Sequence, residues 1–368
     1  MIPLFQQYPL LKEKLPHVCL GEFPTPVHRL DRLGRELGVD QLYIKDDGVS
    51  GSIYGGNKIR KLEFLLAEAL QSGAKEVLTF GCVGSNHVLA TTIYGRQAGL
   101  GSVLMLMPQP NADYVRRNLL MDYRWSAELH LYRNYPLAVA AALYQGLVHR
   151  RRRGQAPHII PVGGSSPVGV AGFVNAAFEL KVQIERGEVP EPDRVYVALG
   201  SMGTAVGLEL GLRAVNLRSQ VVPVRVVGHK FANARKMVRL FHKTNSLLHS
   251  LDPTFPEYGF REEEAGLRHG FYGREYARFT EEGVGAVTRM AESEGIRLEG
   301  TYTGKALAAL LSDAEKGDVK DKVVLFWNTH NARDFSEAIA DVDYHQLPKA
   351  FHRYFEEEVQ PLDHASWK

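Results

Sequence analysis

Apolar positions along the chain follow two alternating patterns. Short runs of Val, Ile, Leu and Phe alternate with longer segments in which apolar residues recur every three or four positions. The runs predict strands and the longer segments predict helices. The predicted strands are 42–45, 76–80, 102–107, 129–132, 159–162, 194–199, 221–227 and 322–327. The predicted helices are 29–37, 58–72, 88–98, 114–123, 137–153, 168–186, 204–214, 232–249, 281–294 and 304–315. This alternation predicts an α/β fold with mostly parallel sheets covered by helices.

Residues 55–63 join a predicted strand to a predicted helix and contain the first candidate for chemistry, Lys58. Two glycines at 55 and 56 allow the backbone to approach a bulky group, and Asn57 has the side chain of a helix N-cap. Lys58 would lie in the first helical turn beside Arg60 and Lys61. Both the helix dipole and like charge lower the pKa of a lysine, and the neutral amine makes a Schiff base. The alternative is an ordinary solvated lysine, one of 44 Lys and Arg residues.

A glycine-rich turn, Gly200-Ser201-Met202-Gly203-Thr204, lies between a predicted strand and the helix that follows it. Glycines at such a turn expose backbone N–H groups at a helix N-terminus, where an anion binds. Ser201 and Thr204 add hydroxyl donors. The turn lacks the G-x-G-x-x-G pattern of dinucleotide-binding folds, and Gly304-Lys305 lacks the spacing of a Walker loop. The turn is therefore either a phosphate site or a structural tight turn.

A second polar turn, residues 81–87, follows another predicted strand and contains Ser85, Asn86 and His87. The C-terminal end of a strand is where α/β proteins place ligands. Ser85 and Asn86 also have side chains that cap helices, so a capping role is the alternative. A pyridoxal phosphate site needs a reactive lysine, a polar turn and a phosphate site together. The combination makes this cofactor the leading candidate.

Composition narrows the range of partners. The 368 residues are enough for two domains, and a net charge of +2 predicts no nucleic-acid partner and no membrane surface. The basic run 149–153 is interpreted as a solvated helix end. Two cysteines, Cys19 and Cys82, provide neither a disulfide framework nor a metal site. The start of the chain has no signal-peptide pattern, and no apolar run is long enough to span a bilayer. We therefore expect a cytoplasmic protein without a metal.

Several motifs, taken in order, resemble those of the fold-type II pyridoxal-phosphate enzymes, the tryptophan synthase β-like superfamily. Within it the chain is similar to the branch that contains D-cysteine desulfhydrase and 1-aminocyclopropane-1-carboxylate (ACC) deaminase, over residues from about 23 to 335. The motifs are Pro24-Thr25-Pro26, Gly55 to Glu63, Gly84 to His87, Pro161 to Ser165, Gly200 to Thr204, and Tyr302 to Ala306. The resemblance implies two domains, each with a mostly parallel sheet flanked by helices. The small inserted domain would be 61–168, and 1–60 with 169–368 would form the large cofactor-binding domain.

The resemblance also implies roles for individual residues. Lys58 would carry pyridoxal 5'-phosphate and move the Cα proton, and Ser85 would act as a base near the substrate carboxylate. Tyr302 and, less closely matched, Tyr276 would lie beside the reacting atoms. The implied cofactor-binding residues are Lys58, Asn86, Gly200, Ser201, Met202, Gly203, Thr204 and Thr329. The implied substrate-binding residues are Ser85, Asn86, His87, Tyr302 and His330. The resemblance further implies a small amino-acid substrate and a homodimer.

Two departures from the family pattern fall near the expected substrate site. The chain has Thr329-His330-Asn331 where the family usually has two glycines after the threonine, and Arg274 precedes Tyr276 in place of a glycine-rich turn. His330 and Arg274 are each either a specificity residue or a packed or solvated side chain that is neutral to function. As specificity residues they favour a substrate larger or more acidic than D-cysteine.

The reaction implied by the resemblance is a β-elimination of the D-cysteine desulfhydrase type, which gives pyruvate, ammonia and sulfide. Thr303 and Thr329 stand where the deaminase members carry Glu and Leu, which favours the desulfhydrase type. One alternative is another pyridoxal-phosphate-dependent reaction: ACC deamination, racemisation, dehydration or β-replacement. The other is a non-catalytic pyridoxal-phosphate-binding protein, which has no chemical need for Lys58, Ser85 and Tyr302 together.

Overall fold

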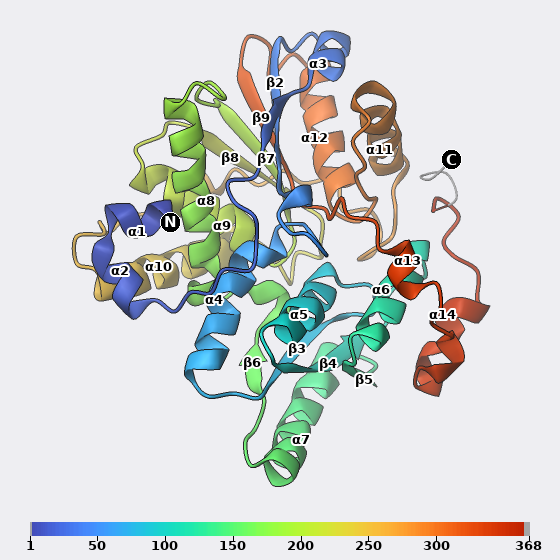
Figure 1. Cartoon of the computed structure of the whole chain (residues 1–368). Coiled ribbons are helices and arrows are strands. Elements are labelled where there is room, and N and C mark those ends of the chain that lie inside the picture. Colours follow the sequence, from blue (N-terminus) through green and yellow to red (C-terminus); the bar gives the residue numbers. More distant parts are fainter. Residues whose placement is uncertain (1, 364–368) are drawn as a thin grey trace.

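Two separate sheets organise the structure, a computed structural model that describes residues 2–363 (Figure 1). The first sheet has the order β1-β2-β9-β7-β8, with β1 antiparallel to β2 and the other pairs parallel. Its strands are β1 (Val27–Arg29), β2 (Gln41–Asp46), β9 (Val323–Asn328), β7 (Arg194–Leu199) and β8 (Gln220–Arg225). The second sheet has the order β5-β4-β3-β6, with parallel pairs. Its strands are β5 (Glu128–Leu131), β4 (Gly101–Met107), β3 (Glu76–Cys82) and β6 (His158–Ile160). The predicted α/β class with mostly parallel sheets is confirmed.

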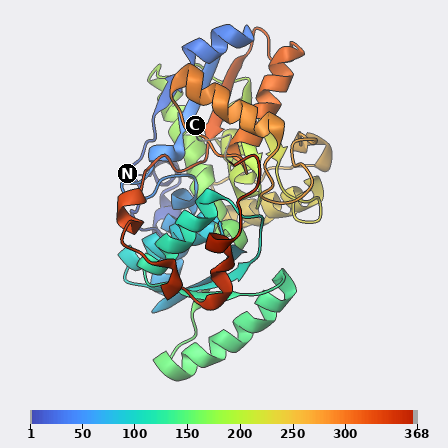
Figure 2. The same cartoon turned by 90° about the vertical axis from the view of Figure 1, so that its right-hand side faces the viewer.

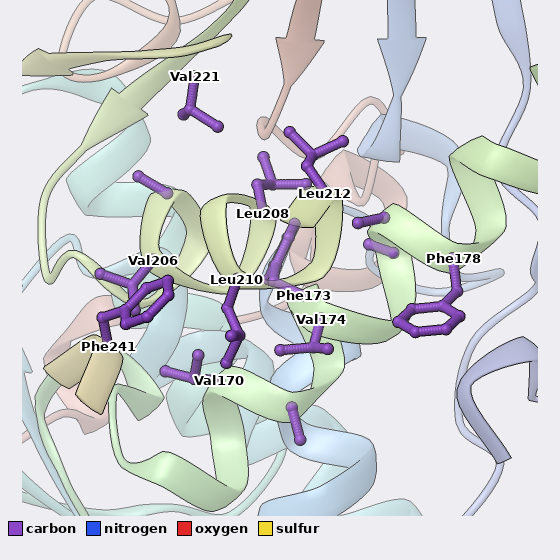
Figure 3. Packing of buried hydrophobic residues seen from close by; sticks show 14 of the residues in the cluster. Val170, Phe173, Val174, Phe178, Val206, Leu208, Leu210, Leu212, Val221 and Phe241 are labelled. Atoms are coloured by element: carbon purple, nitrogen blue, oxygen red, sulfur yellow. The ribbon is translucent and has the colours of Figure 1, made fainter. Parts of the chain in front are cut away.

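Helices cover both faces of the first sheet. The helices on one face are α3 (Asp31–Leu37), α11 (Glu281–Glu294) and α12 (Thr303–Glu315). The helices on the other face are α1 (Pro3–Gln7), α2 (Pro9–Lys14), α8 (Pro167–Glu185), α9 (Gly203–Ala214) and α10 (Ala234–Leu251). Figure 3 shows this second layer, where Phe173 and Val174 of α8 lie beside Leu208 and Leu210 of α9. Gly207 permits the close contact between these helices, because a Cβ there would lie 2.4 Å from Cβ of Phe173.

The second sheet has α5 (Asn86–Gln97) and α6 (Asp113–Arg124) on one face and α7 (Tyr135–Arg153) on the other (Figure 1). Helix α4 (Lys58–Gln71) belongs to both cores, since Leu62 packs with the second sheet and Phe64 packs with α8. None of the helices in residues 2–363 is both long and apolar enough to cross a membrane.

A buried ionic cluster anchors the first turn of α4 to the first sheet. Arg60 donates to Asp47 over 2.7 Å and to Glu179 over 2.9 Å, and Lys45 forms a second ion pair with Glu179. Trp327 Nε1 donates to Asp47 Oδ2 over 2.9 Å. Two cations therefore face two carboxylates, so the charges balance without water. The cluster fixes the turn that carries Lys58.

The predicted strands and helices are all present, with ends shifted by a few residues. The predicted helix 29–37 was wrong at its start, because Val27–Arg29 pairs with β2 and the helix begins at Asp31. Helices α1 and α2 were not predicted. The remaining short elements are η1 (Asp47–Val49), η2 (Val162–Gly164), η3 (Glu262–Ala265), η4 (Tyr344–Gln346), η5 (Lys349–Phe351), α13 (Ser336–Ile339) and α14 (Arg353–Glu356).

The C-terminal segment returns from the first sheet to cover α6. Phe351 and Tyr354 pack in one core cluster with Leu119, and Asn111 Nδ2 donates to the carbonyl oxygen of Tyr354 over 2.9 Å. Residues 364–368 lie outside the described part of the chain. The proposed domain bounds, 61–168 against 1–60 and 169–368, stay predictions.

Candidate active site

The C-terminal ends of strands from both sheets open into one cavity of about 1070 Å³. The predicted site residues that line it are Lys58, Ser85, Asn86, His87, Gly200, Ser201, Met202, Thr204, Tyr276, Tyr302, Thr329 and His330. Gly203 lies behind the lining as the first residue of α9, and its N–H donates to Ser165 Oγ over 3.3 Å. The fold thus gathers side chains from distant segments around one space, as expected for the edge at which parallel strands end.

The two glycines before Lys58 make room for neighbouring backbone and not for a ligand. A Cβ on Gly55 would lie 1.8 Å from the carbonyl oxygen of Gly48. Gly56 has a φ of +90°, and a Cβ there would lie 3.0 Å from the carbonyl oxygen of Thr329. The prediction that these glycines admit a bulky group was therefore wrong, because they admit two neighbouring backbone segments.

The predicted N-cap role of Asn57 was also wrong. Asn57 has helical backbone angles, and its side chain makes no capping hydrogen bond. Its Nδ2 instead donates to Thr204 Oγ1 over 2.9 Å, and its backbone N–H donates to the carbonyl oxygen of Thr329 over 3.2 Å. Asn57 therefore connects the start of α4 to two other walls of the cavity.

Burial lowers the pKa of the Lys58 amine from 10.5 to about 8. The predicted direction is confirmed, but crowding by Arg60 was the wrong cause. Arg60 is held by Asp47 and Glu179 in the ionic cluster behind α4. Loss of hydration penalises the charged amine, so a useful fraction of Lys58 is neutral near pH 7.

The turn after β7 forms an anion cradle, consisting of Gly200–Thr204 with Ser165. Met202 has a φ of +70°, which turns the backbone at the start of α9. Ser165 Oγ donates to Ser201 Oγ over 2.8 Å. Hydroxyl and backbone N–H groups therefore meet at a helix N-terminus, an arrangement suited to a phosphate.

A buried lysine, Lys61, adjoins the anion cradle. Its Nζ donates to the carbonyl oxygen of Gly163 over 3.1 Å and to Ser165 Oγ over 3.2 Å. Burial and then the charge of Lys58 lower the pKa of Lys61 well below its usual value. Within residues 2–363 no carboxylate oxygen lies within 4 Å of Lys61 Nζ. A phosphate in the cradle would supply the missing anion. The sequence indicated Lys61 only as a neighbour of Lys58.

The orientation of Asn86 is fixed from outside the cavity. Its Oδ1 accepts from Tyr54 Oη over 3.0 Å and from Asn118 Nδ2 over 3.4 Å. The Nδ2 amide group of Asn86 is then left to donate a hydrogen bond to a ligand. Ser85 caps α5, since its Oγ accepts from the N–H of Val88 over 3.4 Å, and it also lines the cavity. Capping and ligand contact were alternatives in the sequence, and the geometry of Ser85 accommodates both.

Two tyrosines that line the cavity contact each other. The hydroxyls of Tyr276 and Tyr302 are hydrogen-bonded to each other. Burial raises the pKa of both phenols, so both are protonated at neutral pH. Glu299 holds Tyr302 in place, because its carboxylate accepts from the backbone N–H of Tyr302 and Thr303 over 2.7 and 2.8 Å. Glu299 also lines the cavity, which no sequence motif had indicated.

A family model described as "Pyridoxal-phosphate dependent enzyme" matches residues 18–329. The chain belongs to this family. It is therefore a pyridoxal-phosphate-dependent enzyme of fold type II, and the cofactor fits the residues present. Lys58 offers an amine, Asn86 an amide N–H, and the anion cradle with Lys61 a place for the phosphate.

Relatives within the family share most of their length with this chain. This chain is 35% identical over 322 residues to a Pyrococcus abyssi protein named "Putative 1-aminocyclopropane-1-carboxylate deaminase". The match covers 85% of this chain and 91% of that one. It is 32% identical to D-cysteine desulfhydrase from Serratia proteamaculans, covering 88% and 96%. The crystal structure of an ACC deaminase homologue matches with a TM-score of 0.76 and 32% identity, covering 92% and 99%.

The departures from the family pattern differ in where they lie. His330 lines the cavity, and burial lowers the pKa of its imidazole. Asn331 is buried, and its Oδ1 accepts from the backbone N–H of Gly55 over 2.6 Å and of Arg333 over 3.1 Å. Arg274 is exposed and does not belong to the lining, which favours the second of its two predicted alternatives, a solvated side chain. The arginine of that loop that lines the cavity is Arg278, which pairs with Glu275.

Distant segments hold the loop that carries Tyr276. Lys305 Nζ donates to the carbonyl oxygens of Tyr272 and Arg278, each over 2.7 Å. From the C-terminal segment, Gln360 accepts from the N–H of Phe279 over 2.7 Å and donates to the carbonyl oxygen of Ala277 over 3.0 Å. Lys305 therefore has a structural role, and the C-terminal segment supports one wall of the active site.

Proposed function

We propose that this enzyme catalyses β-elimination from a small amino acid in the manner of D-cysteine desulfhydrase, releasing pyruvate, ammonia and sulfide. The observation that carries the proposal is a half-buried Lys58 with a pKa of about 8 in one cavity with Ser85, Tyr302 and an anion cradle. The Serratia relative named D-cysteine desulfhydrase, at 32% identity over nearly its whole length, supports this reaction.

Pyridoxal phosphate, when bound, supplies an electron sink for a carbanion at the substrate Cα. The chain supplies the proton transfers. The Lys58 amine, neutral in part at pH 7, takes the Cα proton and, after the leaving group has departed, gives a proton to Cβ, which becomes the methyl carbon of pyruvate. Ser85 Oγ accepts its capping hydrogen bond and keeps its own proton to donate to a substrate carboxylate. Tyr302 remains protonated and can donate to the group that leaves Cβ, while Tyr276 fixes the direction of its hydroxyl.

The position of Thr303 limits one argument for the desulfhydrase type. Thr303 is buried in the first turn of α12, where its Oγ1 donates to Glu299, and it does not belong to the cavity lining. Thr329 does line the cavity and is the threonine that supports the desulfhydrase type. Glu299 favours a second candidate, ACC deamination, because it places a carboxylate in the cavity beside Tyr302.

A substrate panel separates the two candidates. We expect holoenzyme to release sulfide and pyruvate in equal amounts from D-cysteine, or a thiol and pyruvate in equal amounts from a D-cysteine that carries a substituent on sulfur. Release of 2-oxobutyrate and ammonia from ACC would support the deaminase instead. No keto acid from any amino acid would exclude both candidates and leave racemisation, β-replacement or a non-catalytic cofactor-binding protein. Lys58→Ala should be inactive, and the exposed Lys75→Ala is the matched control.

The cellular location that we propose is the cytoplasm, supported by two free cysteines, Cys19 and Cys82, which fit a reducing compartment. We also propose a homodimer, and the surface that it would use is argued next.

A further inference from the structure

Helix α7 is apolar on the side that faces its own sheet. Ala138 and Ala142 pack against Leu78 and Met105 of the second sheet. Two polar residues are buried on the same side, Gln145 and His149, and His149 Nδ1 lies 2.7 Å from Glu76 Oε2. This inward face has the contacts that a surface helix normally needs.

The outward face of α7 is also apolar. Leu143, Tyr144 and Leu147 are 69, 65 and 61% exposed, and Leu137 lies on the same side. We call these four residues the outer stripe. Residues 135–148 contain no charged side chain. A surface helix normally carries polar residues on its outer face, whereas a helix that is apolar all round is normally buried. In Figures 1 and 2, α7 lies at the lower edge of the molecule with no other element beneath it.

A further exposed apolar residue lies on the edge strand of the same sheet. Ile159 of β6 is 54% exposed, and it pairs in register with Leu78, whose side chain packs against α7. Partners in register point to the same face of a sheet, so Ile159 lies on the face that α7 covers. Together the outer stripe and Ile159 expose on the order of 400–500 Å² of apolar side chain, an area comparable to that of the largest apolar patches on monomers, which are often functional. A standard interface buries about 800 Å² on each partner, so this apolar area would supply the core, about half of the interface, and polar residues around it would supply the rim.

We propose that the outer stripe of α7 is the surface on which a second copy of this chain docks, with the two α7 helices antiparallel about a two-fold axis near Leu143 and Tyr144. A two-fold contact places the same patch against itself, so an apolar stripe without charges is its own complement. The charges at the helix end set the direction. Arg150 to Arg153 follow the stripe, and antiparallel pairing keeps the two arginine runs at opposite ends of the contact. Parallel pairing would bring them together.

The arrangement of charge disfavours a lipid surface as the occupant. A helix that lies on an anionic membrane carries its Lys and Arg along the flanks of the apolar stripe. In α7 the arginines are confined to the last turn, and Arg153 already pairs with Glu76 over 2.9 Å. Helix α7 also reaches the active site, because its first residue, Tyr135, lines the cavity.

The test is the molar mass of holoenzyme in solution, measured by light scattering over a range of concentrations. We expect wild-type protein and Leu70→Glu, a change at an exposed leucine on α4, to be dimers. The double variant Leu143→Glu with Leu147→Glu should be a monomer with an unchanged circular dichroism spectrum. In a Cys19→Ser background, Tyr144→Cys should cross-link two copies on oxidation, which tests the same contact if the double variant does not fold.

Three results would overturn the proposal. One is a wild-type protein that is monomeric at every concentration. Another is a folded double variant that remains a dimer together with a Tyr144→Cys protein that does not cross-link, which would place the interface elsewhere. The third is co-sedimentation of wild-type protein with phosphatidylserine vesicles that the double variant loses, which would assign the stripe to a membrane.

Discussion

The side-chain amide of Asn57 donates a hydrogen bond of 2.9 Å to the hydroxyl of Thr204, across 147 positions of sequence. Asn57 precedes Lys58, and Thr204 belongs to the anion cradle. The bond therefore fixes the distance between the two groups that we propose to hold opposite ends of the cofactor.

Breaking this hydrogen bond should weaken cofactor binding. We expect Asn57→Ala and Thr204→Val each to raise the dissociation constant of pyridoxal phosphate about fivefold, since one hydrogen bond contributes about 1 kcal/mol. In the double variant the dissociation constant should rise by less than the product of the two single increases, because both substitutions remove the same hydrogen bond. A fluorescence titration of apoprotein measures all four constants. Fully multiplicative effects would show that the bond does not couple the two sites.

The pKa of Lys58 predicts how cofactor capture depends on pH. With a pKa of about 8, roughly a tenth of the amine is neutral at pH 7, whereas an ordinary lysine has less than about one part in a thousand. The initial rate of covalent capture by apoprotein should rise about tenfold per pH unit below pH 8 and level off above it. The measurement is the absorbance change on mixing at pH 6 to 10. A rate that still rises tenfold between pH 9 and 10 would show that Lys58 has an ordinary pKa.

A buried carboxyl in α6 should make stability depend on pH. Burial raises the pKa of Asp122 from 3.8 to about 8, and Thr92 Oγ1 donates to it over 2.8 Å. The folded chain then binds this proton more tightly than the unfolded chain, so stability falls as pH rises from about 4 to about 8 and changes no further above that.

The variant Asp122→Asn removes this dependence. In urea unfolding at pH 5 to 9, the free energy of unfolding of wild type should fall relative to the variant by up to about 1.4 kcal/mol per pH unit until pH 8. Asp341→Asn, at an exposed carboxylate, is the control and should run parallel to wild type. A constant difference between wild type and Asp122→Asn would contradict the shifted pKa.

His330 and Asn331 replace two glycines of the family pattern, but their variants should act differently. His330→Gly removes a side chain from the cavity lining, and we expect kcat/KM for D-cysteine to rise at least about threefold, or ~0.7 kcal/mol. Asn331→Gly removes the acceptor of two backbone N–H groups, of which that of Gly55 is buried, and this should cost about 1–3 kcal/mol of stability without a gain in activity. Steady-state kinetics and thermal unfolding of both variants decide this. If D-cysteine is already turned over better than every larger amino acid, His330 does not restrict the substrate.

The elements and the site could be predicted from sequence where the signal is local. Strand 194–199, the turn Gly200–Thr204 and the following helix form one continuous pattern, and the structure keeps it. The antiparallel β1 was missed because three residues of strand carry no periodicity, and its place depends on pairing with β2.

Contacts between distant segments could not be predicted from spacing. Nothing near Arg60 in sequence indicates Glu179, yet that carboxylate draws Arg60 away from Lys58. Arg274 and Arg278 lie one helical turn apart in number, and the fold of their loop decides that only Arg278 lines the cavity. In the same way, the role of Gln360 depends on the C-terminal segment, which folds back against the loop that ends at Phe279.

The central claim is that Lys58 binds the cofactor covalently in the cavity shared by the two sheets. The most direct measurement is borohydride reduction of the purified holoenzyme, followed by digestion and mass spectrometry of its peptides. We predict that the added pyridoxyl mass lies on Lys58 and that Lys58→Ala protein acquires none at its other lysines. Modification of Lys61 or Lys305 in wild-type protein, with Lys58 unmodified, would contradict the account.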